Sequence, residues 1–486
     1  DIKISMTRIS IFKINQHFIL CVVLLLMGSQ LFSQTNKANV WCFGDKAGVD
    51  FNSGAPVAFA RTATTNLIEG SSSMCDEFGN LLFYASGVNA WDKSHVVMPN
   101  GSGLLGYGSS TQGALITPVI GTCDKYYLFT VGAYEQGANL PGLHYSIIDM
   151  SLQGNGTISC PLGDIPAGSK NIHLTPAPLK DSLDEKITSV MHSNGTDYWI
   201  IVRELATNVY YSYLVTAAGI NTVPVQSATG GAPGVGSWYG YLKPTKDGKQ
   251  LVGARLWCFN SSGNIPRFIE LIDFNNTTGA LSNAQKINVV NDHFWYGVAF
   301  SCNDSVIYAT GAQFFGSYKL YQYQRFAPVV SATETVVTNL SDASSLQLGP
   351  DGKIYNFTFI KTSLDVINNP NSVASPNFAT SIVPLVAGTR SMMGSPNIFH
   401  GYEREFCNSF SSSGNTNTIC LGDSVALGKS HYTTCHSYSW SPAAGLSNTS
   451  ALNPIAKPLV PTTYTLTVTT LNCDTYTESI SIGIAI

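Results

Sequence analysis

The sequence predicts an all-β protein: a β-propeller of roughly seven blades, followed by an immunoglobulin-like β-sandwich. Two observations support this fold class. Charged residues make up only 12% of the 486 residues, whereas 44 Gly, 23 Tyr and 23 Phe are present, which suits short strands and tight turns. A turn–strand unit also recurs along most of the chain, while amphipathic helical periodicity is nearly absent.

The recurring unit pairs a turn built on Gly, Asn or Asp with a strand rich in β-branched and aromatic residues. It occurs at 76–87, 121–132, 193–203, 245–256, 302–311 and 349–359. Its spacing of roughly 45 to 55 residues is typical of propeller blades. A second strand follows at 144–157 and 268–281, with 320–326 at the matching place. We therefore predict a propeller over 38–402, with its last blade closed by pairing 40–51 with 381–399. A β-solenoid or two stacked sandwiches is the alternative.

The C-terminal part of the chain has a different pattern. Residues 403–418 are polar and rich in Ser and Asn, which predicts a linker. Short alternating strands fill 419–486, and Cys420, Trp440 and Cys473 follow the cysteine–tryptophan–cysteine order of an immunoglobulin-like core. We expect a disulfide between Cys420 and Cys473, which on the entropy model restricts the unfolded chain by about 4 kcal/mol.

The N-terminus predicts export. Residues 1–33 are interpreted as a signal peptide with a few upstream residues: Arg8 and Lys13 precede the apolar run 18–27, and small residues follow it. The run is far shorter than the ~20 residues that span a bilayer, so no transmembrane segment is expected after signal removal. The predicted location is secreted or extracellular, with attachment to the cell surface as an option.

Several stretches resemble one family. WCFGDKAGVDFNSGAPVA, MPNGSGLLGYGSSTQGALITP and LQLGPDGKIYNF look like secreted propeller proteins of Bacteroidota. ICLGDSVAL, SYSWSPAAGL and TTYTLTV resemble the polycystic-kidney-disease-type or immunoglobulin-like modules that follow such propellers. The resemblance implies a gliding-associated group linked to type IX secretion, and it implies no established activity.

The same resemblance suggests a modification. An Asp-Ser pair precedes an aliphatic residue at three places and looks like the sites that Bacteroidota O-glycosylate on exported proteins; the candidate acceptors are Ser182, Ser305 and Ser424. The alternative is an ordinary Asp-Ser turn before a strand.

Motif analysis assigns no catalytic residue, no metal ligand and no cofactor. The formal charge of −4 comes without a run of Lys or Arg, which argues against nucleic acid as a partner. G-x-G-x-x-G at 101–106 leads into no helix, so it predicts a loop. No G-x-S-x-G, H-E-x-x-H or C-x-x-C sequence occurs.

One set of residues is a candidate ligand site. Trp238-Tyr239-Gly240 and Trp295-Tyr296-Gly297 stand at the same place in successive units, and the corresponding positions elsewhere include Gln112 and Lys186. If the strands that follow are the inner strands of their blades, these side chains reach the ring from one face, where aromatic and polar groups suit sugar or peptide recognition. The alternative is packing between blades.

Two functions follow from these observations. The first is a monomeric, non-catalytic binding or adhesion protein that recognises an extracellular glycan or protein ligand through the propeller face. The second is a secreted polysaccharide hydrolase or lyase with its active site in the propeller mouth, which requires two facing carboxylates about 5 to 9 Å apart.

Overall fold

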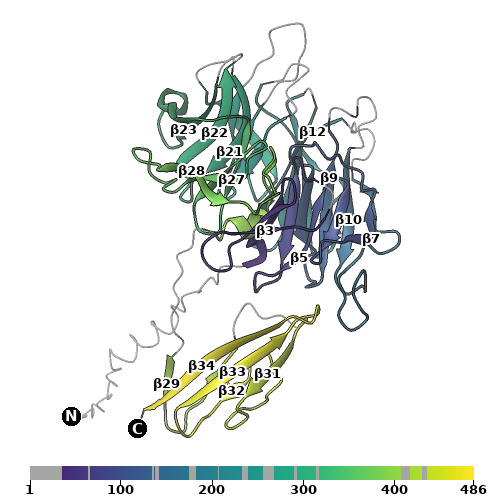
Figure 1. Cartoon of the computed structure of the whole chain (residues 1–486), viewed down its shortest axis with the longest axis vertical. Helices are drawn as coiled ribbons and strands as arrows, with labels where there is room; N and C mark the ends of the chain where they lie inside the picture. Colours follow the sequence, from purple (N-terminus) through teal and green to yellow (C-terminus); the bar gives the residue numbers. More distant parts are fainter. Residues whose placement is uncertain are drawn as a thin grey trace, which may run out of the picture. The chain divides into compact units, whose positions relative to one another are not determined.

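Seven β-sheets succeed one another along the N-terminal four-fifths of the protein, as shown by a computed structural model (Figure 1). The structure describes residues 36–63, 66–133, 136, 142–174, 182–205, 207–231, 239–255, 268–288, 293–313, 317–406, 416–428 and 435–485. The predicted signal peptide at 1–33, Trp238 and most of the expected linker lie outside these residues. No helix among them is long and apolar enough to span a membrane.

Each sheet is an antiparallel blade that follows the chain order. Blade 1 contains β1 (Val40–Phe43), β2 (Ala47–Asp50) and β3 (Val57–Ala60). Blade 2 contains β4 (Ser71–Cys75), β5 (Leu81–Ser86), β6 (Asn89–Asp92) and β7 (Val97–Ser102). Blade 3 contains β8 (Ala114–Pro118), β9 (Lys125–Val131), β10 (Leu143–Asp149) and β11 (Ile172–His173). The 3₁₀ helix η1 (Asn36–Ala38) precedes them.

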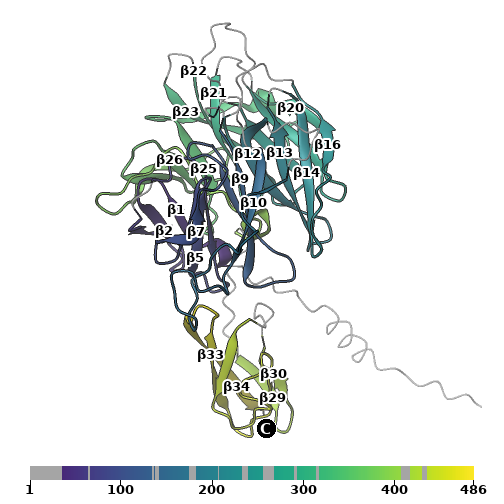
Figure 2. The same ribbon diagram turned by 90° about the vertical axis from the view of Figure 1, so that its right-hand side faces the viewer.

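The other blades continue the series. Blade 4 contains β12 (Leu183–Met191), β13 (Tyr198–Glu204), β14 (Val209–Thr216), β15 (Gly219–Ile220) and β16 (Val225–Ala228). β15 and β16 both pair with β14, and β12, β13, β14 and β16 are labelled in Figure 2. Blade 5 contains β17 (Leu242–Pro244), β18 (Gln250–Ala254), β19 (Ile269–Asn275) and β20 (Ala280–Lys286). Blade 6 contains β21 (His293–Phe300), β22 (Val306–Gln313), β23 (Tyr318–Gln324) and β24 (Thr335–Asn339), with η3 (Val330–Thr333). Blade 7 contains β25 (Ser344–Leu348), β26 (Ile354–Thr358), β27 (Ser363–Ile367) and β28 (Phe378–Pro384).

The blades form a closed ring. Successive inner strands β4, β8, β12, β17, β21 and β25 contact one another, and β28 of blade 7 contacts β3 of blade 1. Isolated bridges join Arg390 to Asp45 and Lys46, so the two ends of the propeller sequence meet there. This arrangement leaves few free sheet edges, as expected for a propeller. We call the end of the ring where inner strands begin the N-face, and the opposite end the C-face.

The segment Ser391–Phe406, here the axial segment, runs through the centre of the ring. Asn397 alone bonds to three inner strands: its N–H donates to Ser71 O (2.6 Å), and its Nδ2 donates to Ala114 O (3.3 Å) and Ile187 O (3.0 Å). Farther along, His400 bonds to Met191 and Thr245, and Gln347 Nε2 donates to Glu403 Oε1. One segment can reach so many inner strands only along the ring axis.

The axial segment also explains why blade 1 has three strands. Pro396 forms a parallel bridge with Ser71, so the segment runs in the same direction as the inner strands and takes the inner position that blade 1 lacks. The segment ends in the short helix α2 (His400–Glu403). Of the expected pairing of 40–51 with 381–399, the structure shows the bridges of Arg390 with Asp45 and Lys46, whereas Ser381 belongs to β28.

The C-terminal module consists of two sheets around one core, drawn in yellow in Figure 1. One sheet has the order β29 (Thr416–Cys420), β34 (Thr475–Ala485), β33 (Thr462–Thr469) and β31 (Ser437–Ser441). The other pairs β30 (Val425–Ala426) with β32 (Ile455–Ala456). Trp440 is buried in the core with Tyr464 and Leu466, so the strands alternate between core and solvent as their sequences predict.

The disulfides differ from the predicted pairing. Cys473 is bonded to Cys160 and Cys435 to Cys123, with Cα–Cα distances of 5.4 Å and 6.3 Å, whereas Cys420 is a free, exposed thiol. The expected Cys420–Cys473 bond is therefore wrong. Cys420 is paired with Ala485 at one end of β34, and Cys473 precedes the other end. A strand of 11 residues separates them by about 33 Å, far beyond the reach of a disulfide.

These two disulfides connect the module to the propeller, and non-covalent contacts accompany them. Residues Thr35–Ile486 form one compact unit. Lys93 Nζ lies 2.6 Å from Asp474 Oδ2, and the Phe78 ring stacks on Tyr476 with centroids 4.0 Å apart. Phe78 lies in the turn between β4 and β5, at the C-face. The N-face is the opposite end of the ring.

Candidate functional site

Polar side chains form a layer at the N-face, where the inner strands begin. Gln112 N donates to Glu185 O (2.9 Å), and Gly240 N donates to Thr111 Oγ1 (3.4 Å). Tyr241 N donates to Tyr296 O (2.9 Å). Among the positions that the sequence aligned across blades, Gln112 and Tyr239 precede inner strands at this end of the ring, and Tyr296 lies near the beginning of β21. Lys186 lies within β12, and Trp238 is outside the described residues.

Gln112 is fully buried in this layer. Its Oε1 accepts from Leu242 N (2.8 Å), and its Nε2 donates to Leu242 O (3.3 Å) and to Asn397 Oδ1 (3.2 Å). The side chain thus joins β17 to the axial segment. As a ligand contact, the prediction for Gln112 is not supported, since no part of its amide faces solvent.

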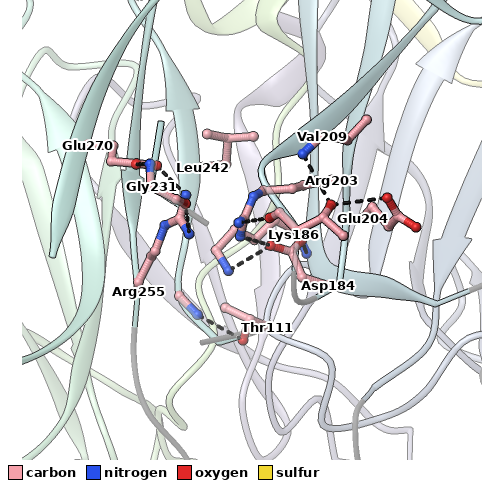
Figure 3. Close-up of polar contacts among 12 residues, drawn as sticks. Thr111, Asp184, Lys186, Arg203, Glu204, Val209, Gly231, Leu242, Arg255 and Glu270 are labelled. Atoms are coloured by element: carbon pink, nitrogen blue, oxygen red, sulfur yellow. Dashed lines mark hydrogen bonds and ion pairs between the residues drawn. The ribbon is translucent and has the colours of Figure 1, made fainter. Parts of the chain in front are cut away.

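A network of buried charged side chains lies between blades 4 and 5 (Figure 3). Asp184 Oδ2 lies 3.2 Å from Lys186 Nζ and 3.4 Å from Arg203 Nη1. Arg255 forms an ion pair with Glu270, whose Oε1 also accepts from Gly231 N (3.0 Å). All five ionic side chains are at most 4% exposed, so each charge depends on these partners for solvation.

Lys186, a predicted ligand residue, belongs to this network. Burial, together with the nearby Arg203 and Arg255, lowers the pKa of its ammonium to about 8, although Asp184 opposes the shift. Three cations here face two ion-paired carboxylates. We therefore interpret Lys186 as part of the contact between two blades rather than as a surface contact for ligand.

A cleft opens at the N-face between blades 6 and 7. Its volume is about 440 Å³, within the range of small-molecule and side-chain binding pockets. Four aromatic rings line it, together with small, polar and flexible side chains: Phe294, Tyr296, Tyr318, Phe359, Thr310, Gly311, Asp342, Ala343, Ser344 and Met393. Met393 comes from the axial segment, so the cleft extends from the ring centre outward.

The predicted aromatic pair at 295–296 is divided between two roles. Tyr296 lines the cleft. Trp295 is fully buried and packs edge-on against Tyr321, with ring centroids 5.0 Å apart, in a core shared with blade 5. Successive residues of a strand point to opposite faces, so only one of the two can reach the cleft. Packing between blades, the alternative left open from the sequence, is correct for Trp295. Tyr239 is half-buried at the start of blade 5.

The electrostatics of the cleft depend on Asp342. It is the only charged side chain among the described residues that line the cleft, and it has no ion-pair partner among them. Its Oδ1 accepts from Ala343 N (2.7 Å), which leaves Oδ2 available. Burial raises the pKa of Tyr318, and the Asp342 carboxylate raises it further, so this phenol stays neutral beside the carboxylate.

Ser344 adds a second unsatisfied group. Its side chain is fully buried, it lines the cleft, and its Oγ has no hydrogen-bond partner in the part of the chain that the structure describes. Buried hydroxyls are normally hydrogen-bonded, so this oxygen is available to form a hydrogen bond with a ligand group in the cleft. The backbone O of Ser344 is already an acceptor for Thr310 Oγ1 (2.5 Å).

The C-face holds a much smaller cavity of about 30 Å³ beside Lys243, His400 and Glu403. Lys243 Nζ donates to Gln347 Oε1 (2.6 Å), and Gln347 Nε2 donates to Glu403 Oε1 (2.6 Å). Burial lowers the pKa of Lys243 and raises that of Glu403. This chain of buried groups fixes helix α2 against blades 5 and 7, and the cavity has room for about one water.

The three candidate glycosylation sites differ in accessibility. Ser424 is exposed, whereas Ser182 and Ser305 are half-buried. Ser305 Oγ also donates to Asn303 Oδ1 (2.7 Å), the geometry of a turn residue. No group of three or more His, Cys, Asp or Glu side chains among the described residues is arranged to hold a metal ion.

Most of the cleft was not predicted from the sequence. Phe294 precedes the predicted pair, while Tyr318, Asp342 and Phe359 come from loops and strand ends far apart in the chain. These residues share only their position, because each lies where a strand of blade 6 or 7 begins or ends at the N-face. An alignment of the blades that included the second and third strands would have brought them together.

Comparisons with known proteins concern the fold. No protein-family model matches the sequence, and no curated protein matches it. The β-propeller domain of Cps50 (Swd1) from Myceliophteria thermophila is 13% identical, with a TM-score of 0.37, and the match covers 66% of this chain and 93% of that chain. A candidate 6-phosphogluconolactonase of Bacteroides uniformis is 11% identical, with a TM-score of 0.42, and covers 73% and 97%. At such identities the activities of these proteins are no guide to this one.

Proposed function

We propose that this chain is an exported, non-catalytic binding protein whose ligand, an extracellular glycan or protein, is held in the cleft between blades 6 and 7. The proposal depends on the composition of the cleft, which is lined by four aromatic rings, the Asp342 carboxylate and the unpartnered Ser344 Oγ. Aromatic side chains give large contact areas at low entropic cost, and a few polar groups fix orientation.

The position of the cleft supports the proposal. The ring axis is filled by the axial segment, so a ligand approaching the N-face meets the cleft beside the axis rather than a channel. The C-terminal module is bonded at the other end of the ring, through Cys123–Cys435 and Cys160–Cys473. It therefore leaves the N-face open to a partner.

Export accounts for these disulfides, because such bonds persist in oxidising compartments. We interpret residues 1–33 as the signal peptide for this export. We also propose that the protein acts as a monomer, either secreted or attached to the cell surface. We further propose that the C-terminal module is an immunoglobulin-like or polycystic-kidney-disease-type domain, because Trp440 occupies the core between its two sheets.

A binding screen tests the proposal. The protein from Gln34 onward is applied to glycan and peptide arrays, and each hit is titrated against a Tyr318→Ala/Phe359→Ala variant and a Leu459→Ala/Val460→Ala variant. The first pair removes half-buried rings from the cleft; the second truncates exposed residues of the module. We expect the cleft variant to weaken binding at least about tenfold while remaining folded, and the module variant to bind normally. Binding lost only in the module variant, or no hit on either array, contradicts the proposal.

A further inference from the structure

The chemistry of the cleft selects among ligands. Its described lining contains four aromatic rings and one carboxylate, and it contains no Lys, Arg or His. An aromatic ring is electron-rich on its face, so rings around a carboxylate attract a cation, both through the ring faces and through the opposite charge. A neutral sugar gains the ring contact but leaves the Asp342 carboxylate without a counter-ion.

Asp342 is costly to leave unpaired in this place. It is half-buried, and the nearest described cationic side chains do not reach it within ion-pair distance. A carboxylate that is partly removed from water gains more from a nearby cation than an exposed one does, because the local dielectric constant is lower. Among the described residues, the Asp342 carboxylate therefore has no counter-ion, and a bound cation would supply one.

The hydrogen-bond geometry favours an ammonium over a guanidinium. Ala343 N already occupies Asp342 Oδ1 at 2.7 Å, so the planar, two-pronged pairing that a guanidinium prefers would have to compete with that bond. An ammonium acts as a compact charge with three donors. Asp342 Oδ2 and the unpartnered Ser344 Oγ are two acceptors that border the same cleft.

The shape of the cleft suits a side chain with an apolar stem. Phe294, Phe359 and Met393 supply apolar surface, and Met393 is flexible and polarizable. A lysine side chain offers four methylene groups to such walls and carries its charge at the tip. The volume of about 440 Å³ also leaves room for neighbouring peptide atoms.

We propose that the cleft between blades 6 and 7 binds an alkylammonium group, presented as a lysine side chain of a protein ligand, with Asp342 as its counter-ion and the rings of Phe294, Tyr296, Tyr318 and Phe359 around its stem. This rests on the proposed function and narrows its ligand from a glycan or protein to a protein with an accessible lysine. Asp342 and Ser344 act here as binding residues.

The test uses three Gly-Gly-X-Gly-Gly peptides in which X is lysine, trimethyl-lysine or norleucine, titrated into the full exported chain by calorimetry or NMR. Norleucine keeps the apolar stem and lacks the charge. We expect the lysine peptide to bind at least about tenfold more tightly than the norleucine peptide. Trimethyl-lysine keeps the charge but has no N–H donor, so its affinity should lie between the other two, and the affinity of both cationic peptides should fall as salt rises.

Cleft variants, each with a control variant outside the cleft, show whether the preference for lysine arises in the cleft. Asp342→Asn keeps the acceptor for Ala343 N and removes only the charge, so it should abolish the preference for lysine over norleucine. Asp423→Asn removes the same charge from an exposed site in the C-terminal module and should have no effect. Phe359→Leu should weaken the cationic peptides several-fold, whereas Phe326→Leu, at a 70% exposed position outside the cleft, should not.

Different failures can be distinguished with a neutral oligosaccharide such as cellohexaose. If norleucine binds as tightly as lysine, or if Asp342→Asn leaves the preference intact, the lysine proposal is overturned. If cellohexaose binds in the cleft and the lysine peptides do not, the proposal is again overturned, while the binding function stands. If array hits are unaffected by every cleft variant, both the binding site and the lysine proposal are refuted.

Discussion

Replacing Asn397 with Ala should strongly destabilise the ring, because this side chain connects the axial segment to the inner strands. Asn397 is 1% exposed. Its Nδ2 donates to Ala114 O and Ile187 O, at 3.3 Å and 3.0 Å, and its Oδ1 accepts from Gln112 Nε2 at 3.2 Å. The substitution removes all three bonds and leaves their partners buried.

The expected loss follows from these partners. A buried polar group left without its partner costs about 1–3 kcal/mol. The two carbonyl oxygens lose a donor, whereas the Gln112 amide retains Leu242 O as an acceptor at 3.3 Å. We therefore expect the free energy of unfolding to fall by about 2–5 kcal/mol. Asn448→Ala, at an exposed turn of the C-terminal module, should change it by less than about 0.5 kcal/mol.

Urea unfolding followed by tryptophan fluorescence measures both variants. The reasoning predicts a lower midpoint for Asn397→Ala with an unchanged dependence on urea, because the native surface stays the same. A loss below about 1 kcal/mol would falsify the claim that the axial segment closes the ring through this residue.

Three further predictions concern packing, pH and the disulfides. Trp295→Ala should lower the free energy of unfolding by about 3–5 kcal/mol in thermal or urea unfolding, because the ring fills the core between blades 5 and 6; a small loss would contradict that packing. Burial lowers the pKa of His400 to about 4 from its usual value near 6.5, so the unfolded chain binds this proton first as pH falls. Wild type should thus lose about 3 kcal/mol relative to His400→Gln between pH 6.5 and 4, with the full contribution present above pH 6.5; equal pH profiles for the two proteins speak against a buried neutral imidazole. A protease site placed between 407 and 415 should release the C-terminal module on gels only after reduction, and release without reductant would show that the two disulfides to the propeller do not form.

The repetitive part of the fold was predictable from the sequence. Turn–strand units such as 245–256 and 349–359 form the hairpins of blades 5 and 7, because alternation of buried residues and a Gly or Asp turn act locally. The closure of the ring was predictable only in outline. No periodic pattern marks the axial segment, which is held by side chains such as Asn397 and His400 rather than by a strand ladder.

The disulfides and the cleft could not be predicted for a related reason. The Cys–Trp–Cys order suggested a bond within the module, but the bonding partner depends on how the module meets blade 3, and this is a long-range contact between Cys160 and Cys473. Likewise, Trp295 and Tyr296 have the same aromatic character in the sequence. Both rings are buried in the same core, and only the direction of each side chain from β21 makes Tyr296 the one that lines the cleft.

The central claim is that ligand binds at the N-face cleft, and a crystal structure of the protein with its tightest array ligand tests it most directly. The account predicts electron density for that ligand between blades 6 and 7, in contact with Phe359 and Met393 and with a cationic group beside Asp342. Density at the C-terminal module or on the outer strands, with the cleft empty, would contradict it.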